Sequence, residues 1–127
     1  MSQPITFFVP GPLPNLNEII GAAKGYHGRG FGYKTMKEEW TSLVVQAIRK
    51  CHIRPIKKAH FAFYWKEKNK RRDPDNFVAG QKFIFDGLVE AGVLVNDGWD
   101  QIMSIEHLWG VDKLEPGVVV SILEVSV

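Results

Sequence analysis

Short stretches rich in apolar residues, one of them with a strictly alternating pattern, predict four β-strands along the chain. The clearest lies at residues 60–65, where Phe61, Phe63 and Trp65 stand at every second position. This spacing puts three aromatic side chains on one face of a strand, which is typical of a sheet packed against a core. The other three predicted strands cover residues 5–10, 102–109 and 118–127.

Apolar positions spaced three to four residues apart predict two helices. The first begins at a capping box, in which Thr35 covers free amide groups and Glu38 reaches back to the backbone. Its buried stripe consists of Met36, Trp40, Leu43, Val44, Ala47 and Ile48. The second helix is expected from about residue 74 to residue 91, and Gly92 is suited to end it. Its buried face consists of Phe77, Ile84, Leu88 and Ala91, supported by Val78, Phe85 and Val89.

The segment between the first strand and the first helix, residues 11–32, is rich in proline and glycine and is expected to be a loop. Its side chains Lys24, Tyr26, His27 and Arg29 could close over a ligand. The resulting order is strand, helix, strand, helix, strand, strand. This order predicts an α/β or α+β fold, with a mixed sheet of about four strands and two main helices packed on it.

Length and composition narrow the class of protein. A chain of 127 residues with 45% hydrophobic residues fits one domain, spanning residues 1–127, with a core of its own. No apolar run approaches the ~18–20 residues that a membrane helix needs, and the first residues do not resemble a secretory leader. Cys51 is the only cysteine, which excludes an intrachain disulfide and a multi-cysteine zinc site. We therefore expect a cytoplasmic domain without a membrane anchor.

The charge is unevenly distributed along the chain. Residues 49–72 contain ten basic residues and one acidic residue, so this segment carries +9 in a chain of net charge +2, and the remainder carries −7. Such density favours a polyanion such as nucleic acid as a partner, although a solvated surface would also explain it. Trp65 within the segment could stack on a base, but a core position is favoured. The candidate DNA contacts are Lys66, Lys68, Lys70, Arg71 and Arg72, together with Arg29 from the glycine-rich segment.

Closely spaced carboxylates follow the basic segment directly. If the second helix is continuous, Asp75, Lys82 and Asp86 lie within about 20° of one another around its axis, because offsets of seven and eleven residues return to one side. Asp73 immediately precedes this helix, and Asp97 follows it where the chain would run back. Carboxylate oxygens suit Mg²⁺, and a nearby lysine can stabilise negative charge that develops during phosphodiester hydrolysis.

Each of these residues also has a purely structural interpretation. Asp73 could cap the second helix with Pro74 at its first position, and Asp75 could interact with the helix dipole. Asp86 could pair with Lys82 one turn away. The segment Asn96-Asp97-Gly98 could be only a turn.

Three motifs together resemble the RusA family of Holliday junction resolvases. They are Arg71-Arg72-Asp73-Pro74-Asp75-Asn76, then Lys82 with Asp86-Gly87-Leu88, then Val95-Asn96-Asp97. The resemblance covers residues 71–102 well and is weaker before them. Two departures are an apparent insertion of Val78-Ala79-Gly80 before the lysine, and Gly87 in place of alanine.

The resemblance implies a homodimeric, Mg²⁺-dependent endonuclease, commonly of prophage origin, which acts in DNA recombination and repair by cutting four-way junctions with paired symmetric nicks. It implies Asp73, Asp75 and Asp97 as metal ligands, Lys82 as the catalytic lysine, and supporting roles for Asn76 and Asp86. We expect Mg²⁺ as cofactor, with Mn²⁺ able to replace it, and no small-molecule cofactor. Two alternatives stay open, a branched-DNA-binding module without activity and another metal-dependent phosphohydrolase that acts on nucleic acid.

Overall fold

A four-stranded mixed sheet forms one layer of the domain. The computed structural model describes residues 3–24 and 31–126, and its sheet has the order β1-β4-β2-β3. The strands are β1 (Ile5–Pro10), β2 (Ala59–Glu67), β3 (Ile102–Val111) and β4 (Gly117–Glu124). β4 runs antiparallel to β1 and β2, whereas β2 and β3 are parallel. All four predicted strands are therefore confirmed.

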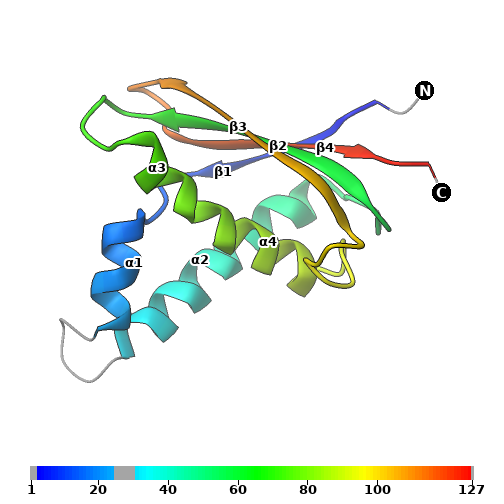
Figure 1. Cartoon of the computed structure of the whole chain (residues 1–127), viewed down its shortest axis with the longest axis horizontal. Coiled ribbons are helices and arrows are strands. Elements are labelled where there is room, and N and C mark those ends of the chain that lie inside the picture. Colours follow the sequence, from blue (N-terminus) through cyan, green and yellow to red (C-terminus); the bar gives the residue numbers. More distant parts are fainter. Residues whose placement is uncertain (1–2, 25–30, 127) are drawn as a thin grey trace.

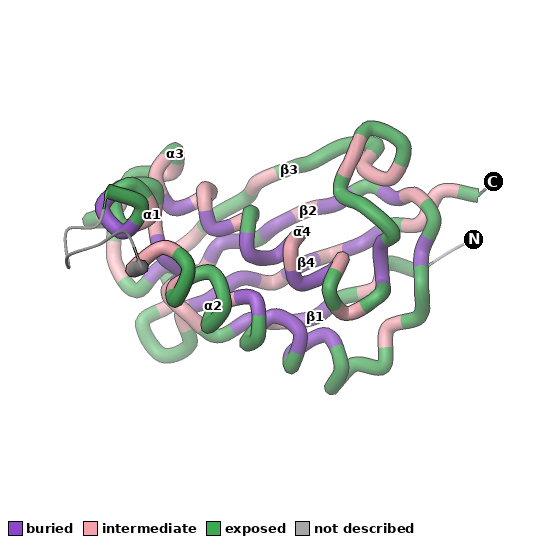
Figure 2. Tube along the Cα trace, turned by 90° about the horizontal axis from the view of Figure 1, so that it is seen from below, coloured by how far each residue is buried: buried purple, intermediate pink, exposed green. Residues whose placement is uncertain are grey.

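The helices lie together on one face of this sheet, as Figure 1 shows. They are α1 (Leu16–Ala23), α2 (Phe31–Lys50), the short α3 (Pro74–Phe77) and α4 (Gln81–Glu90), with a 3₁₀ turn, η1 (Val78–Gly80), between the last two. Phe61, Phe63 and Trp65 of β2 are each at most 1% exposed and face the helices. Figure 2 shows buried positions on β1, β2 and β4 and along α2 and α4, whereas the outer strand β3 has none. The α+β fold and the core position of Trp65 are thus confirmed.

The prediction of a loop over residues 11–32 is wrong in part, because α1 lies within it. The signal is a capping box: Asn15 Oδ1 accepts the Glu18 N–H at 2.8 Å, and Glu18 Oε1 accepts the Asn15 N–H at 3.1 Å. The first predicted helix also begins earlier, since α2 starts at Phe31 and Thr35 lies inside it. The capping box expected at Thr35 is therefore wrong. Residues 25–30, with Tyr26, His27 and Arg29, lie outside the described residues.

The second predicted helix is divided rather than continuous. It follows the α3–η1–α4 sequence of elements, and the 3₁₀ turn covers the apparent insertion of residues 78–80. A Cβ atom added at Gly80 would lie 3.1 Å from Leu13 Cβ and 3.3 Å from Trp65 Cη2, so this segment packs closely against the core. A 3₁₀ turn advances about 120° per residue instead of about 100°. The spread of about 20° predicted for Asp75, Lys82 and Asp86 assumes a continuous α-helix, whereas the three residues of the 3₁₀ turn add roughly 60° between Asp75 and Lys82.

Gly87 has a packing reason that the sequence does not reveal. A Cβ atom added there would lie 2.3 Å from Val44 Cγ1, and Val44 is completely buried. α4 thus approaches α2 more closely than an alanine would allow. The predicted end of the helix is confirmed, because α4 ends at Glu90 and Gly92 has a positive φ of 79°.

The parallel pairing of β2 with β3 separates two groups of candidate residues. Both strands run from the end at which Ala59 pairs with Ile102 to the end at which Glu67 pairs with Val111. Asp73 follows the second end, whereas Asp97 precedes the first. Within the described ranges, no helix is long and apolar enough to span a bilayer.

Candidate metal and nucleic-acid site

A cation-rich loop, residues 68–73, connects β2 to α3, and we refer to it as the basic loop. Lys68, Lys70 and Arg71 in it are exposed. Asn69 Oδ1 accepts the N–H of Arg71 at 2.9 Å, which fixes the turn from within. Three positive side chains are therefore presented to solvent by a loop with an internal hydrogen bond.

Arg72 is used differently, because its guanidinium is held inside the fold. It donates from Nε to Glu67 Oε1 at 2.8 Å and from Nη2 to Glu67 Oε2 at 3.3 Å, and Glu67 is only 6% exposed. Its Nη1 donates to the carbonyl of Leu13 at 2.8 Å and lies 3.5 Å from Glu18 Oε1. This bidentate pair fastens the basic loop to β2 and to the segment before α1. Arg72 is thus a structural anchor in this arrangement, rather than a free cation for DNA.

Asp73 stands at the N-cap position of α3 with extended backbone angles, φ −80° and ψ 150°. Its side chain makes no capping hydrogen bond, while its carbonyl accepts the N–H groups of Asn76 and Phe77 at 2.9 and 3.1 Å. The capping role considered for the Asp73 side chain is therefore not found. Asp73 and Asp75 are both exposed, so two carboxylates next to the basic loop are open to solvent.

Asn76 connects α3, which carries Asp75, to α1. Its Oδ1 accepts the N–H of Asn17 at 3.2 Å and so links α3 to the first turn of α1. Lys82 is exposed at the second position of α4, after the break at Gly80. It belongs to a helix that is separate from the one carrying Asp75.

Lys66 lies on the face of the sheet that the helices leave open. Its Nζ is 3.3 Å from Asp112 Oδ2 and 4.8 Å from the centre of the Phe8 ring. The backbone N–H of Glu115, followed by Lys66 and the N–H of Leu114, holds the pKa of Asp112 below its ordinary value, although burial acts in the opposite direction. Lys66 is therefore paired and separate from the exposed lysines of the basic loop.

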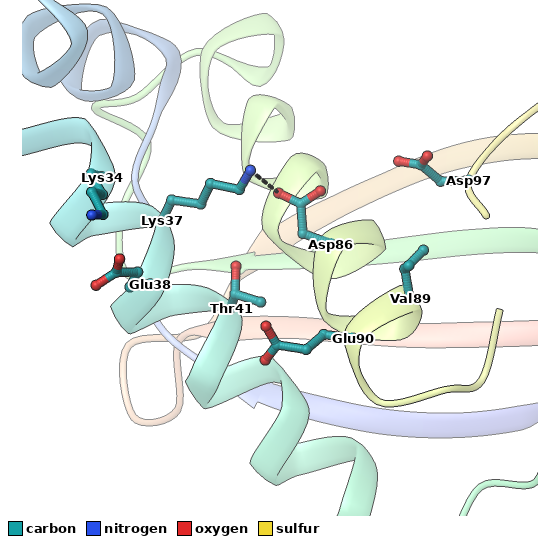
Figure 3. Close-up of a pocket in the computed structure, with 8 residues that line it drawn as sticks. All are labelled: Lys34, Lys37, Glu38, Thr41, Asp86, Val89, Glu90 and Asp97. Atoms are coloured by element: carbon teal, nitrogen blue, oxygen red, sulfur yellow. Dashed lines mark ion pairs between the residues drawn. The ribbon is translucent and has the colours of Figure 1, made fainter. Parts of the chain in front are cut away.

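Asp97 and Asp86 share a different region, a groove of about 600 Å³ between α2 and α4 (Figure 3). We call it the α2–α4 groove, and it is lined by Lys34, Lys37, Glu38, Thr41, Asp86, Val89, Glu90 and Asp97. Asp86 Oδ2 lies 4.0 Å from Lys37 Nζ, so its ion-pair partner is on α2, and the pairing considered with Lys82 is not found. Thr41 Oγ1 and Asp86 Oδ2 are buried and have no hydrogen-bond partner among the described residues.

The structure does not bring Asp97 to Asp73 and Asp75 within one chain. β2 has nine residues, which at about 3.3 Å per residue separates its two ends by roughly 25–30 Å. Figure 1 shows α3 at one end of the domain and the α4–β3 connection, which carries Asp97, at the other. Among the described residues, no group of three or more His, Cys, Asp or Glu side chains is arranged to hold a metal ion.

Two aromatic features of β3 were not predicted as part of a site. His107 Nδ1 accepts the indole N–H of Trp65 at 2.9 Å, and burial lowers the pKa of His107. Trp109 is 52% exposed and touches Phe77 of α3, with ring centres 6.1 Å apart. The apolar residues of the segment 102–109 predicted the strand, but the sequence gives no sign that Trp109 lies beside Asp73.

Comparison with models of known protein families gives no match to this chain. A search of curated proteins likewise finds no similar sequence.

Proposed function

We propose that this protein is a Mg²⁺-dependent endonuclease that cuts branched DNA, resolving four-way junctions as a homodimer. The observation that carries the proposal is the direct sequence of three exposed cations and two exposed carboxylates, Asp73 and Asp75, on a loop anchored by Arg72. Cations next to carboxylates suit a ligand that brings both a phosphate backbone and a divalent metal ion.

The donor set fits a hard cation. Asp73 and Asp75 provide oxygen ligands, and the side chain of Asp73 is not used by the helix cap. Mg²⁺ typically takes one or two carboxylates, keeps several waters and binds substrate phosphate. When bound, such an ion supplies an activated water and offsets charge on the phosphate oxygens. Lys68, Lys70 and Arg71 then hold the DNA backbone, and Lys82 is the candidate for stabilising charge that develops in the transition state.

The third predicted ligand, Asp97, requires a second copy of the chain. Because β3 begins near Asp97 and ends near the basic loop, a copy that runs antiparallel along β3 brings its own Asp97 toward Asp73 and Asp75. A two-fold axis makes two such sites, each with carboxylates from both subunits. Two equivalent sites suit a substrate that needs two related nicks.

The free edge of β3 favours such a dimer. β3 is an outer strand of the sheet, and exposed large apolar side chains gather on it and on its flanking loops. These are Val95, Trp99, Met103, Ile105, Leu108 and Leu114, each at least 43% exposed. An outer strand with exposed apolar residues is a template for pairing with another chain.

The test is incubation of the purified protein with a mobile four-way junction and with a matched linear duplex, each with Mg²⁺. We expect paired nicks in the junction and none in the duplex. Asp73→Asn should abolish cleavage while binding stays equal or becomes tighter, because phosphate is repelled less. Glu115→Gln, at an exposed acidic position in the β3–β4 turn, is the matched control and should cleave normally.

The remaining outcomes identify the competing functions. Junction binding without cleavage under Mg²⁺ or Mn²⁺ would contradict the enzyme and favour the inactive branched-DNA-binding module. The separation of Asp97 from Asp73 within one chain is the observation that keeps this second candidate open. Cleavage of duplex and single strands at the rate of the junction would instead favour a general phosphohydrolase of nucleic acid.

A further inference from the structure

A pocket of about 470 Å³ lies at the end of β2 and β3, beside Asp73. Its lining includes two aromatic side chains, Trp109 and Phe77, which we call its floor, and three residues of the basic loop, Asn69, Lys70 and Asp73, which we call its rim. We propose that this pocket receives one unstacked nucleobase of the DNA strand whose phosphate lies at Asp73. The proposal rests on the proposed function and names the part of a branched substrate that the site recognises.

The aromatic floor gives the pocket an affinity for a flat ring. Trp109 is half exposed, while Phe77 is 3% exposed and meets it at an interplanar angle of 75°. Such an edge-to-face contact holds the indole in one orientation and leaves part of it available. Stacking of bases on aromatic side chains is a common mode of recognition for unpaired nucleic acid, because every base has a π-face.

The rim distinguishes a nucleotide from a purely apolar ligand. Lys70 supplies a cation for the phosphate that accompanies the base, and Asn69 is an amide able to reach a base edge. Arg72 also lines the pocket, and its guanidinium is held in place by two hydrogen bonds to the buried Glu67. This side of the pocket is therefore formed before a ligand binds. A pocket that exists before binding costs less ordering of the protein when a ligand enters.

The pocket is compatible with the proposed dimer. Trp109 pairs in register with the buried Trp65, so its side chain points to the helix side of the sheet. Strand pairing between two copies uses the backbone edge of β3 instead. The base pairs that flank a branch point can lose a stacking neighbour on one side, so a base leaves the helical stack at lower cost there than inside a continuous duplex, and this ties the pocket to branched DNA.

The experiment is a double-mutant cycle between protein and DNA, measured by binding without cleavage in Ca²⁺. The DNA is a junction with or without a single abasic site at the branch nucleotide, tested at each branch position in turn. Trp109→Ala should weaken binding of the intact junction roughly 5- to 150-fold, the range for one stacked base. At one branch position the abasic site should abolish most of that effect, and Trp109→Phe should retain binding within a few-fold. Leu123→Ala, at a position of β4 that is 42% exposed on the opposite sheet face, is the control and should show no coupling.

Every outcome of this experiment either supports or overturns the proposed base pocket. Additive effects of Trp109→Ala and the abasic site at every branch position would overturn the base pocket, even if the protein cleaves junctions normally. Coupling at one position in a protein that never cleaves would support the pocket and remove only the enzymatic proposal. An equal loss of binding for a fully paired duplex would overturn the pocket as well, because no unstacked base is then involved. Thermal melting shows whether Trp109→Ala folds. If it does not, Trp109→Leu, which keeps an apolar side chain but has no aromatic ring, takes its place in the cycle.

Discussion

The two ends of the β2–β3 pair carry the same type of side chain, an exposed aspartate, in opposite electrostatic surroundings. Asp73 follows three exposed cations, and the nearest buried carboxylate, Glu67, is neutralised by Arg72. Asp97 shares the α2–α4 groove with Glu38, Asp86 and Glu90 against only Lys34 and Lys37. The described charges would therefore attract a phosphate group to the first end and repel it from the second.

The three candidate metal ligands therefore do not form one site within a single chain, although they follow one another in the same stretch of the sequence. Asp97 contributes to phosphate chemistry only if it is brought out of its acidic surroundings to a cationic partner surface. The fold of one chain does not do this, because the parallel pairing of β2 and β3 leaves Asp73 and Asp97 at opposite ends of the two strands. In the dimer that we propose, a second copy along β3 would meet this requirement without any change in the fold.

Lys82 gives the largest expected single-residue effect after the carboxylates themselves. Lys82→Ala should lower single-turnover junction cleavage by about 10²- to 10³-fold, with little change in affinity, because it would remove a preorganised positive group from the transition state. Lys113→Ala, in the exposed β3–β4 turn, is the control and should cleave normally. Normal cleavage by Lys82→Ala would move the catalytic role to Lys66, Lys68 or Lys70.

Arg72 and Arg71 separate the structural from the functional cations of the basic loop. Arg72→Ala leaves the buried Glu67 without its bidentate partner and should lower the free energy of unfolding by about 2–4 kcal/mol. Arg71→Ala removes an exposed side chain and should change stability by less than about 0.5 kcal/mol. Urea unfolding of both variants measures the difference. Equal stabilities would contradict the anchoring role of Arg72.

The exposed cations should determine how binding depends on salt. Neutralising Lys68, Lys70 and Arg71 together should weaken junction binding and flatten the slope of log K against log salt, by up to about 0.9 for each phosphate that the variant no longer neutralises. Neutralising Lys34 and Lys37 in the α2–α4 groove is the comparison and should leave the slope unchanged. If the groove variant changes the slope more, DNA lies at the other end of the sheet.

His107 gives the smallest expected effect, on the pH dependence of stability. Burial lowers its pKa in the folded state below the ordinary value of 6.5, so the unfolded chain binds the proton more readily. Stability should therefore be unaffected by His107 above pH 6.5 and should fall as the pH drops from 6.5 to the folded pKa. His107→Gln, which can still accept the Trp65 N–H, should flatten this decline in urea unfolding at several pH values. If the His107→Gln variant loses as much stability at low pH as the original protein, the pH dependence comes from other groups.

The sequence alone predicted the four strands and the neighbouring carboxylates of the candidate site, Asp73 and Asp75. Alternation located β2 because Phe61, Phe63 and Trp65 bury one face, and the pair Asp73 and Asp75 is local, since a single residue separates them in the chain. α1 was missed because glycine and proline around it indicated a loop, although the Asn15–Glu18 capping box was readable.

The remaining features depend on contacts between distant segments. The break at Gly80 follows from its approach to Leu13 and Trp65, and the burial of the Arg72 guanidinium follows from Glu67 and Leu13. The distance between Asp73 and Asp97 follows from the parallel register of β2 and β3, which no local pattern encodes. For the same reason, the sequence did not predict that Trp109 and Asp73 line the same pocket.

The most direct test of the composite site is subunit complementation. Asp73→Asn and Asp97→Asn chains with different tags are mixed, unfolded and refolded, and the mixed dimer is isolated through both tags. If each site takes Asp73 from one subunit and Asp97 from the other, one site of the mixed dimer keeps both aspartates, and the dimer should nick one strand of the junction while both parent dimers are inactive. If each site belongs to a single chain, or if the protein does not dimerise, every site lacks one aspartate and the mixture stays inactive. An inactive mixture would therefore contradict a site shared between two subunits.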